Sequence, residues 1–322
     1  MGDLRVINGR GEGGVVEIEG SKGSCFVKPI LSSISVRTKL VITTMHVRVP
    51  RIIWPEILTH RVLSRNARSS RAVPARVMLE EILRDPFMPW RWTRIQQGMQ
   101  GEIGHDAKVV LLNPKTELEE IHSRERAWLL ARDNALGFAK AFADADYHKQ
   151  IFNRLVEPFM WIDGLVTTVT WNNLLWLRDD DAAEPHLRDV AVAIRQVLDS
   201  VKPEPLDDGD WHLPYVTTED YAAASDRFPR MSQQVEWLRK ISAARCARMS
   251  YVPFNGEASY EAELQRYLRL TSESRLHASP MEHQATPDFQ NADGHWARPE
   301  LHGNLLGYVQ ARKLDPREFV AG

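Results

Sequence analysis

The sequence has few cysteines, no long apolar run and almost no net charge, and each absence narrows what the protein can be. Cys25 and Cys246 are its two cysteines, and they are too far apart in the sequence to form a metal-binding pair. We therefore expect a reducing, cytoplasmic environment without disulfides. No stretch approaches the ~18 apolar residues that a membrane-spanning helix needs. The opening residues, MGDLRVINGR, lack the charged start and apolar core of a secretory leader.

The balance of charge excludes another group of functions. The formal net charge is −2, so no overall field draws the chain to nucleic acid or to an anionic membrane. Any anion-binding site must therefore be a local cluster of basic residues. With 322 residues the chain is long enough to bury a full core in one large or two modest domains. A soluble enzyme is the expectation on these numbers.

Glycines near the start imitate a nucleotide-binding loop. Gly9, Gly11 and Gly14 have the spacing of a dinucleotide fingerprint. That loop must open a helix, yet the residues that follow, Val15-Val16-Glu17-Ile18-Glu19, alternate as a strand does. We therefore predict short strands around a glycine-rich hairpin turn over residues 4–30.

Hydrophobic periodicity predicts the remaining elements. β-Branched residues predict a strand over Leu40–Val49, closed by Pro50, and Trp54-Pro55-Glu56 begins a helix. Thr116–Phe142 is predicted to be the longest helix. Shorter helices are predicted over residues 75–83, 147–156, 170–178, 185–199, 231–247 and 257–272. The segment from Lys202 to Pro229, rich in Pro, Asp and Gly, is predicted to be a linker or long connection.

The densest concentration of polar side chains lies in residues 59–71, which we call the signature segment. Its sequence is Thr-His-Arg-Val-Leu-Ser-Arg-Asn-Ala-Arg-Ser-Ser-Arg. Guanidinium groups match phosphate oxygens two at a time, and Ser and Asn add short hydrogen bonds. A phosphorylated ligand is one interpretation of this pattern. A solvated basic face is the other.

The signature segment resembles the motif of the flavin-dependent thymidylate synthases, Arg-His-Arg-x-x-Ser-x-Asn-x-x-Ser-x-Arg-Tyr. Six residues match in register: His60, Arg61, Ser64, Asn66, Ser69 and Arg71. Thr59 and Ala72 replace the motif's first Arg and its Tyr. The resemblance implies an α+β fold with a central, mainly antiparallel sheet flanked by long helices. It also implies a homotetramer whose active sites are shared between subunits.

A second block of residues also resembles this family. Arg154 lies in Arg154-x-x-x-Pro158, and Asn173 and Arg178 lie in the segment Asn-Asn-Leu-Leu-Trp-Leu-Arg. By resemblance, Arg154 holds the nucleotide phosphate of a neighbouring subunit's site and Arg178 faces the pyrimidine ring. On sequence alone, Arg178 is equally a cation at a helix C-terminus.

A third block lies near the C-terminus, although in the family it precedes the signature. It comprises Ala247-Arg248-Met249-Ser250-Tyr251 and residues 277–283, His-Ala-Ser-Pro-Met-Glu-His, which we call the C-terminal block. The order of the blocks predicts a circular permutation, which compact domains tolerate when their termini lie close together. We therefore expect a core and hairpin over residues 1–201, a connection over 202–230 and a permuted segment over 231–322 that completes the core. A metal site in the C-terminal block is disfavoured because its spacing matches no usual zinc signature.

The resemblance implies a reaction and a set of roles. Reduced FAD supplies a hydride, methylenetetrahydrofolate supplies the carbon and NADPH is the reductant, so that dUMP becomes dTMP. Neither cysteine has flanking residues typical of a thiolate nucleophile. The implied substrate contacts are Glu56, Ser69, Arg71, Arg154 and the catalytic Arg178. The implied cofactor contacts are His60, Arg61, Asn66, Asn173, Ser250, His277, Ser279 and Glu282.

Departures from the family leave the substrate open. Glu56 stands where the family usually has Gln, and a carboxylate accepts from an amine such as cytosine N4. Ala67 replaces a Glu, and Ala182-Ala183-Glu184 replaces His-Ala-Gln. A dCMP-acting or hydroxymethylating relative that serves DNA modification is therefore the second hypothesis. A nucleic-acid-binding module is a remote third, because no aromatic residue lies between Thr59 and Arg76.

Overall fold

The computed structural model describes residues 5–7, 14–97, 100–101, 103–113, 116–249, 259–272 and 276–318. Within them, a seven-stranded sheet runs in the order β1-β2-β3-β4-β8-β5, with β9 beside β3. Its pairs are antiparallel except for β3 with β9. The strands are β1 (Arg5–Ile7), β2 (Val15–Glu17), β3 (Phe26–Ser35), β4 (Val41–Pro50), β5 (Ser64–Ala67), β8 (Trp161–Thr168) and β9 (Glu204–Leu206).

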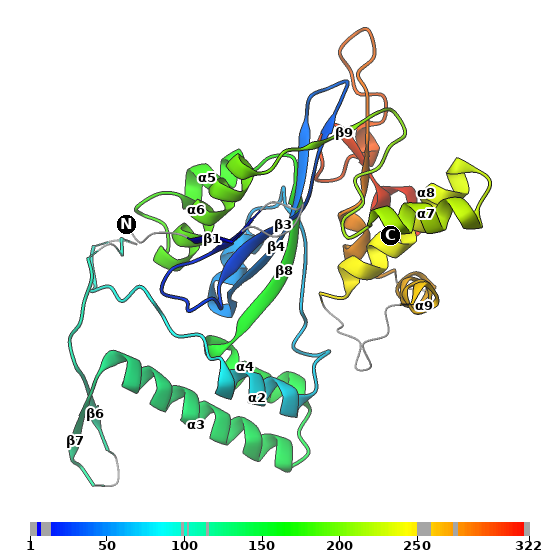
Figure 1. The fold of residues 1–322 in the computed structure, drawn as a ribbon. Helices are drawn as coiled ribbons and strands as arrows, with labels where there is room; N and C mark the ends of the chain where they lie inside the picture. The colour runs from blue at the N-terminus through cyan, green and yellow to red at the C-terminus, as the bar shows by residue number, and fades with distance from the viewer. Residues whose placement is uncertain are drawn as a thin grey trace.

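Helices cover both faces of this sheet and form a separate layer below it. They are α1 (Trp54–Leu58), α2 (Ala75–Arg84), α3 (Arg124–Asp144), α4 (Lys149–Val156), α5 (Asn172–Arg178), α6 (Pro185–Ser200), α7 (Thr218–Arg227), α8 (Met231–Ala247) and α9 (Tyr260–Thr271). Figure 1 shows α5 and α6 on one side of the sheet, α7 and α8 on the other, and α2, α3 and α4 beneath. The expected α+β fold with a mainly antiparallel central sheet is therefore confirmed.

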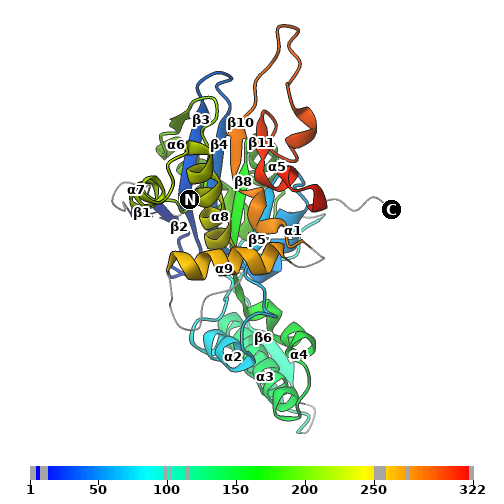
Figure 2. The same cartoon turned by 90° about the vertical axis from the view of Figure 1, so that its right-hand side faces the viewer.

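Two small hairpins lie outside the main sheet. The first joins β6 (Val109–Leu112) to β7 (Glu119–His122), and the second joins β10 (Ala285–Pro287) to β11 (Tyr308–Gln310). The short 3₁₀ helix η3 (Ser279–Glu282) directly precedes β10. Figure 2 shows β10, β11 and α8 in front of the sheet, so the C-terminal region covers one of its faces.

The face of the sheet under α5 and α6 is the main apolar core. Alternate residues of β4, Met45, Val47 and Val49, are fully buried there. They pack with side chains of α5 and α6 that recur at helical spacing: Leu174, Leu187, Val190, Ala191, Ile194 and Val197. Alternation on the strand and the 3.6-residue period on the helix thus bring these apolar surfaces together.

The opposite face carries buried polar side chains. Thr44 on β4 is paired in register with Thr167 on β8, and both are fully buried. Asn66 on β5 lies on the same face, because it pairs with Leu165 two residues before Thr167. Buried polar groups need partners, and here the partners come from the C-terminal region described below.

Two sequence predictions are wrong in part. The longest helix begins at Arg124, because Ser123 caps it by accepting from the Arg126 N–H and residues Glu119–His122 pair with β6 instead. The predicted connection over residues 202–229 contains β9 and α7. The signal for α7 was a capping box in which Thr217 and Asp220 each bond the other's backbone.

The other predicted helices and the strand predicted over Leu40–Val49, which is β4, agree with the structure to within a few residues. The strands β5, β6, β7, β10 and β11 were not predicted. A strand, β2, follows Gly14, as expected for a hairpin, and the turn itself lies outside the described residues. The helix predicted over 231–247 is α8, with the same bounds. The central strand β8 was not predicted. The division into segments 1–201, 202–230 and 231–322 stays a prediction.

At Gly164 on β8 the structure leaves no room for a larger side chain. A Cβ at this position would lie 2.4 Å from Cη2 of Trp54, at the start of α1. We expect Gly164→Ala to lower the free energy of unfolding by about 1–3 kcal/mol, because an overpacked core must shift its neighbours. Urea unfolding measures this loss. Gly137→Ala is the matched control, since nothing lies within 4 Å of its Cβ. In the middle of α3 that change should stabilise by about 0.5–1 kcal/mol.

Candidate functional site

Arg178 joins the end of α5 to α1 and the residues that directly follow α1. Its Nε donates to Nε2 of His60 at 3.1 Å, and its Nη1 donates to Oε2 of Glu56 at 3.0 Å. Nη2 lies 3.4 Å from the hydroxyl oxygen of Thr59. Figure 1 shows the helix that carries Arg178 beside the sheet. The side chain is only 21% exposed, so its fork is fixed by these partners.

His60 is a neutral acceptor in this cluster. Burial lowers the pKa of its imidazole, the positive charges of Arg178 and Arg65 lower it further, and a hydrogen bond with the Asn173 side chain raises it. Because Nε2 accepts from Arg178, the proton of the neutral ring is on Nδ1. Arg178 and Asn173 thus meet at one imidazole, although they lie five residues apart in the sequence.

The C-terminal block lies against the signature segment within a single chain. Nε2 of His283 lies 3.0 Å from Oδ1 of Asn66, and Nδ2 of Asn66 donates to the backbone oxygen of Cys246 at 2.9 Å. Nε2 of Gln310 donates both to the hydroxyl oxygen of Ser64 and to the backbone oxygen of Glu282, each at 2.9 Å. Residues 180 and more positions apart are therefore adjacent at β5.

Glu282 is held by basic groups on both sides. Its carboxylate accepts from Nη1 of Arg312 and from the backbone N–H of Arg65. Burial raises the pKa of this carboxyl, while Arg312 and the Arg65 N–H lower it. Asn304 also bonds the signature segment. Its Nδ2 donates to the backbone oxygens of Arg61 and Leu63 at 3.2 Å each.

The loop after β5 is held by α4. Nδ2 of Asn153 donates to the backbone oxygen of Ser70 at 3.1 Å, and Nζ of Lys149 donates to that of Val73 at 2.9 Å. Arg154 follows Asn153 on this helix, and its Nη1 lies 2.7 Å from Oε1 of Glu157. The predicted phosphate contacts on the loop and on α4 thus belong to adjoining elements.

The predicted ligand-binding residues differ in how far solvent reaches them. His60 and Asn66 are buried, and Glu56, Ser69, Arg178 and Glu282 are partly buried. The exposed ones are Arg61, Arg71, Arg154, Asn173, His277 and Ser279. Among the described residues, no acidic side chain pairs with Arg61 or Arg71. Ser250 lies outside the described residues.

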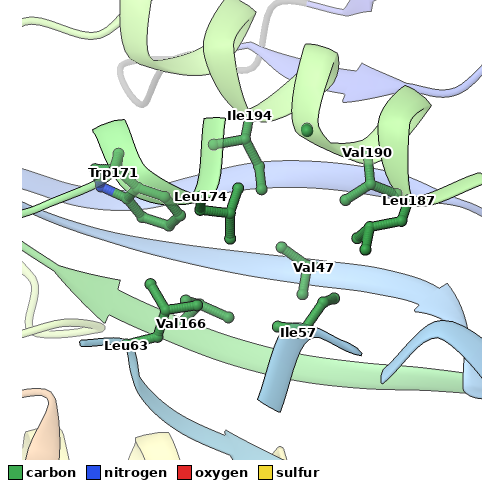
Figure 3. A pocket seen from close by; sticks show the side chains of 10 residues that line it. Val47, Ile57, Leu63, Val166, Trp171, Leu174, Leu187, Val190 and Ile194 are labelled. Atoms are coloured by element: carbon green, nitrogen blue, oxygen red, sulfur yellow. The ribbon is translucent and has the colours of Figure 1, made fainter. Parts of the chain in front are cut away.

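The cavity behind the Arg178 cluster is apolar and very small. Its volume is about 10 Å³, and its lining includes Ile57 of α1, Leu63 and Leu174. Figure 3 shows these side chains facing one another between the sheet and the helices. Such a space is no larger than one water molecule, so it is a packing gap in the core rather than a ligand pocket.

The two thiols are unsuited to nucleophilic attack. Cys25 and Cys246 are buried, and burial raises the pKa of both. A thiol attacks as its thiolate, which these surroundings disfavour. Both ring nitrogens of His283 are engaged, with Thr167 and Asn66, so this histidine has none left for a metal.

Sequence reasoning missed several residues that shape this site. Thr167, Asn304, Gln310 and Arg312 hold the signature segment and the C-terminal block together. None lies in a block that resembles the family, so nothing in the sequence distinguished them from ordinary polar residues.

Comparison with models of protein families and with curated proteins finds no match for this chain. Among solved structures, the crystal structure of a UMP/dUMP methylase, PolB, from Streptomyces cacaoi bound with 5-Br UMP is similar at 12% identity. The alignment covers 53% of this chain and 87% of that one, with a TM-score of 0.36. A likeness at this level carries no argument about what this chain binds or does. No helix of the described residues is both long and apolar enough to cross a membrane.

Proposed function

We propose that this protein is an enzyme that methylates C5 of a pyrimidine deoxynucleoside monophosphate, dUMP to dTMP, with FAD, methylenetetrahydrofolate and NADPH. One observation carries the proposal. The C-terminal block packs on the signature segment through Asn66, His283 and Glu282, although more than 200 residues separate them in the sequence. A permuted member of the flavin-dependent family requires this meeting, and a basic surface helix does not.

FAD fits the residues of one chain only in part. Arg61 and Arg71 expose guanidinium groups without acidic partners among the described residues, which suits the phosphates of a dinucleotide or a nucleotide. The apolar cavity of about 10 Å³ cannot accept the isoalloxazine ring. Our proposal therefore includes the homotetramer with shared sites that the resemblance implies, in which another copy would supply a surface for the ring.

The proposed roles are those that the resemblance implies. His60, Arg61, Asn66, Asn173, Ser250, His277, Ser279 and Glu282 would hold FAD. When bound, FAD supplies the hydride. Arg178 would donate to the pyrimidine and stabilise negative charge that develops as C5 attacks the folate carbon. Ser69, Arg71 and Arg154 would bind the 5′-phosphate and fix the ring's orientation.

Glu56 supports a second candidate, a dCMP-acting or hydroxymethylating enzyme. Oε2 of its carboxylate accepts from Arg178, the same residue that we assign to the pyrimidine edge. A carboxylate at this edge favours a base with an amine, because it can only accept. Glu56→Gln separates the candidates: it should favour dUMP over dCMP if the carboxylate selects cytosine, and change the ratio little otherwise.

The test is turnover with defined components. The purified chain is incubated with FAD, NADPH, methylenetetrahydrofolate and either dUMP or dCMP, and product masses are read. The expected result is a flavin-coloured protein that forms dTMP from dUMP. Turnover of dCMP alone would replace the first candidate with the second. A colourless protein that binds no FAD but retards DNA would favour the remote nucleic-acid-binding alternative.

Arg71 and Arg154 should each contribute to binding of the nucleotide phosphate. We expect Arg71→Ala and Arg154→Ala to raise KM for the nucleotide about tenfold or more with smaller effects on kcat, because each removes a charge-assisted hydrogen bond. Arg76→Ala is the control, since this exposed arginine pairs with Glu80 on α2. Steady-state kinetics measure KM and kcat for these variants. Equal effects of all three changes would contradict the assignment of Arg71 and Arg154 to the phosphate.

A further inference from the structure

Six buried side chains form one continuous chain of hydrogen bonds across the polar face of the sheet. Its members, in order, are Ser33, His212, Thr44, Thr167, His283 and Asn66. The successive distances are 2.9 Å from Ser33 Oγ to His212 Nδ1, 2.8 Å from His212 Nε2 to Thr44 Oγ1, 2.6 Å to Thr167 Oγ1, 2.8 Å to His283 Nδ1 and 3.0 Å from His283 Nε2 to Asn66 Oδ1. The chain crosses β3, β4, β8 and β5.

The Asn66 end of this hydrogen-bond chain determines which atom donates in each of its bonds. The backbone oxygen of Cys246 can only accept, so the atom of Asn66 that faces it is the donor Nδ2. The other amide atom, Oδ1, faces His283 and can only accept. Nε2 of His283 must therefore carry a hydrogen and donate to Asn66.

The remaining bonds follow one after another. A neutral imidazole with its hydrogen on Nε2 has an accepting Nδ1, so Thr167 donates to His283. The only hydroxyl hydrogen of Thr167 is used in that bond, so the Thr167 oxygen accepts from the hydroxyl of Thr44. Thr44 in turn accepts from Nε2 of His212, whose Nδ1 then accepts from Ser33. Each of the five side chains before Asn66 therefore donates toward it.

Burial supports neutral rings at both histidines. His212 and His283 are fully buried, and burial lowers the pKa of each to about 3. The charge of His283 would lower the pKa of His212 further. A proton added to Nδ1 of His283 would also face the hydroxyl hydrogen of Thr167, so protonation breaks the chain.

We propose that this one-way chain is a positioning device in which His283 fixes the amide of Asn66 and seats the C-terminal block on the signature segment. The oxygen of Asn66 faces His283, and its nitrogen keeps a second hydrogen beyond the one given to Cys246. Asn66 therefore presents a donor to a ligand at the signature segment. This last step rests on the proposed function, with flavin as the ligand, and His283 acts there as a positioning residue.

The first experiment reads the tautomers. In the full chain labelled with ¹⁵N, imidazole NMR should show both His212 and His283 with a protonated Nε2 and an unprotonated Nδ1, assigned by loss of signals in His212→Gln and His283→Gln. This measurement on the unaltered protein decides the direction of the chain. An Nδ1-protonated or charged ring at either histidine overturns the proposal.

The second experiment breaks the chain at its middle. Thr167→Val removes the donor to His283, so we expect the ¹⁵N signal of its Nδ1 to shift to that of a nitrogen without a hydrogen bond and the affinity for FAD to fall about fivefold or more. Thr167→Ser, which restores a hydroxyl, should rescue both. Thr43→Val is the matched control, because Thr43 is a buried threonine on the neighbouring strand β4 and its hydroxyl pairs with Ser32, which is not a member of the hydrogen-bond chain.

The outcomes separate this inference from the proposed function. If Thr167→Val leaves the Nδ1 signal of His283 unchanged, the positioning role is wrong. If the tautomers and the Nδ1 signal are as expected but the unaltered protein binds no FAD, the proposed function and the ligand step fall while the one-way chain stands. If Thr43→Val weakens FAD binding as much as Thr167→Val, the effect is one of general stability and the positioning role is again contradicted.

Discussion

Arg178→Ala is expected to lower kcat for pyrimidine methylation by about 10²–10³-fold. A donor directed at charge that develops in the transition state typically accounts for about 2.7–4 kcal/mol. In the structure the Arg178 fork is held by Glu56 and His60 and is only 21% exposed, so it needs no reorientation when the substrate arrives. Binding of the nucleotide should change much less, because the phosphate contacts that we propose for Arg71 and Arg154 remain.

Arg178→Lys tests whether the effect on kcat depends on the planar guanidinium group or only on its positive charge. Lysine keeps the positive charge but has neither the planar fork nor a second nitrogen to bond His60 and Glu56 together. We therefore expect most of the loss in kcat to remain in Arg178→Lys. Full activity in this variant would mean that charge alone is sufficient and that the hydrogen bond with His60 has no catalytic consequence.

Arg188→Ala is the matched control for these changes. Arg188 lies on the neighbouring helix α6 and is also paired with a carboxylate, that of Asp181. Steady-state kinetics at saturating folate measure all three variants, and circular dichroism confirms that each is folded. An unchanged kcat in Arg178→Ala would remove Arg178 from the catalytic role that we propose.

The sequence was sufficient to place most helices, because their apolar residues recur at a fixed spacing. The pattern on α6 and α8 gave their bounds almost to the residue. It failed over residues 116–123, where Leu118 and Ile121 follow the helical spacing but lie exposed on a hairpin. A hydrophobic period records only where apolar residues fall, and it does not reveal which surface they meet.

The candidate site was harder to predict than the fold. The signature segment and the C-terminal block were found by resemblance, and their meeting at β5 was expected from the permuted order of the blocks. The partners that hold them there, Thr167, Gln310 and Arg312, lie in other segments. A hydrogen bond between distant residues leaves no periodic trace in a sequence, so these side chains became visible only in three dimensions.

Acid should destabilise this protein before most of its carboxylates are protonated. Burial lowers the pKa of His212 and of His283 from 6.5 to about 3, so between these values the unfolded chain binds two protons that the folded chain does not. Stability from this source is complete above pH 6.5 and is lost as the pH falls toward 3. From pH 7 to pH 5 the expected loss is about 2 kcal/mol for each histidine, or about 4 kcal/mol together.

A loss of this size is a large share of the usual free energy of unfolding of a domain, which is about 5–15 kcal/mol. His60 adds to it with the same sign, because burial also lowers its pKa. The raised pKa of Glu282 acts in the opposite direction as the pH falls from that raised value to the ordinary 4.5, because the folded state then takes up a proton before the unfolded chain does. The contribution of the two histidines is therefore isolated by variants rather than by the pH window alone.

Urea unfolding at pH 7, 6 and 5 measures this effect, and two variants identify its source. His212→Gln with His283→Gln should be less stable at pH 7, because the buried hydrogen-bond chain is broken, but should lose much less stability on going to pH 5. Thr43→Val also alters a buried hydrogen bond but removes no titratable group, so its pH dependence should match that of the unaltered protein. A loss below about 1 kcal/mol in the unaltered protein would mean that the two imidazoles bind protons in the folded state nearly as readily as in the unfolded chain.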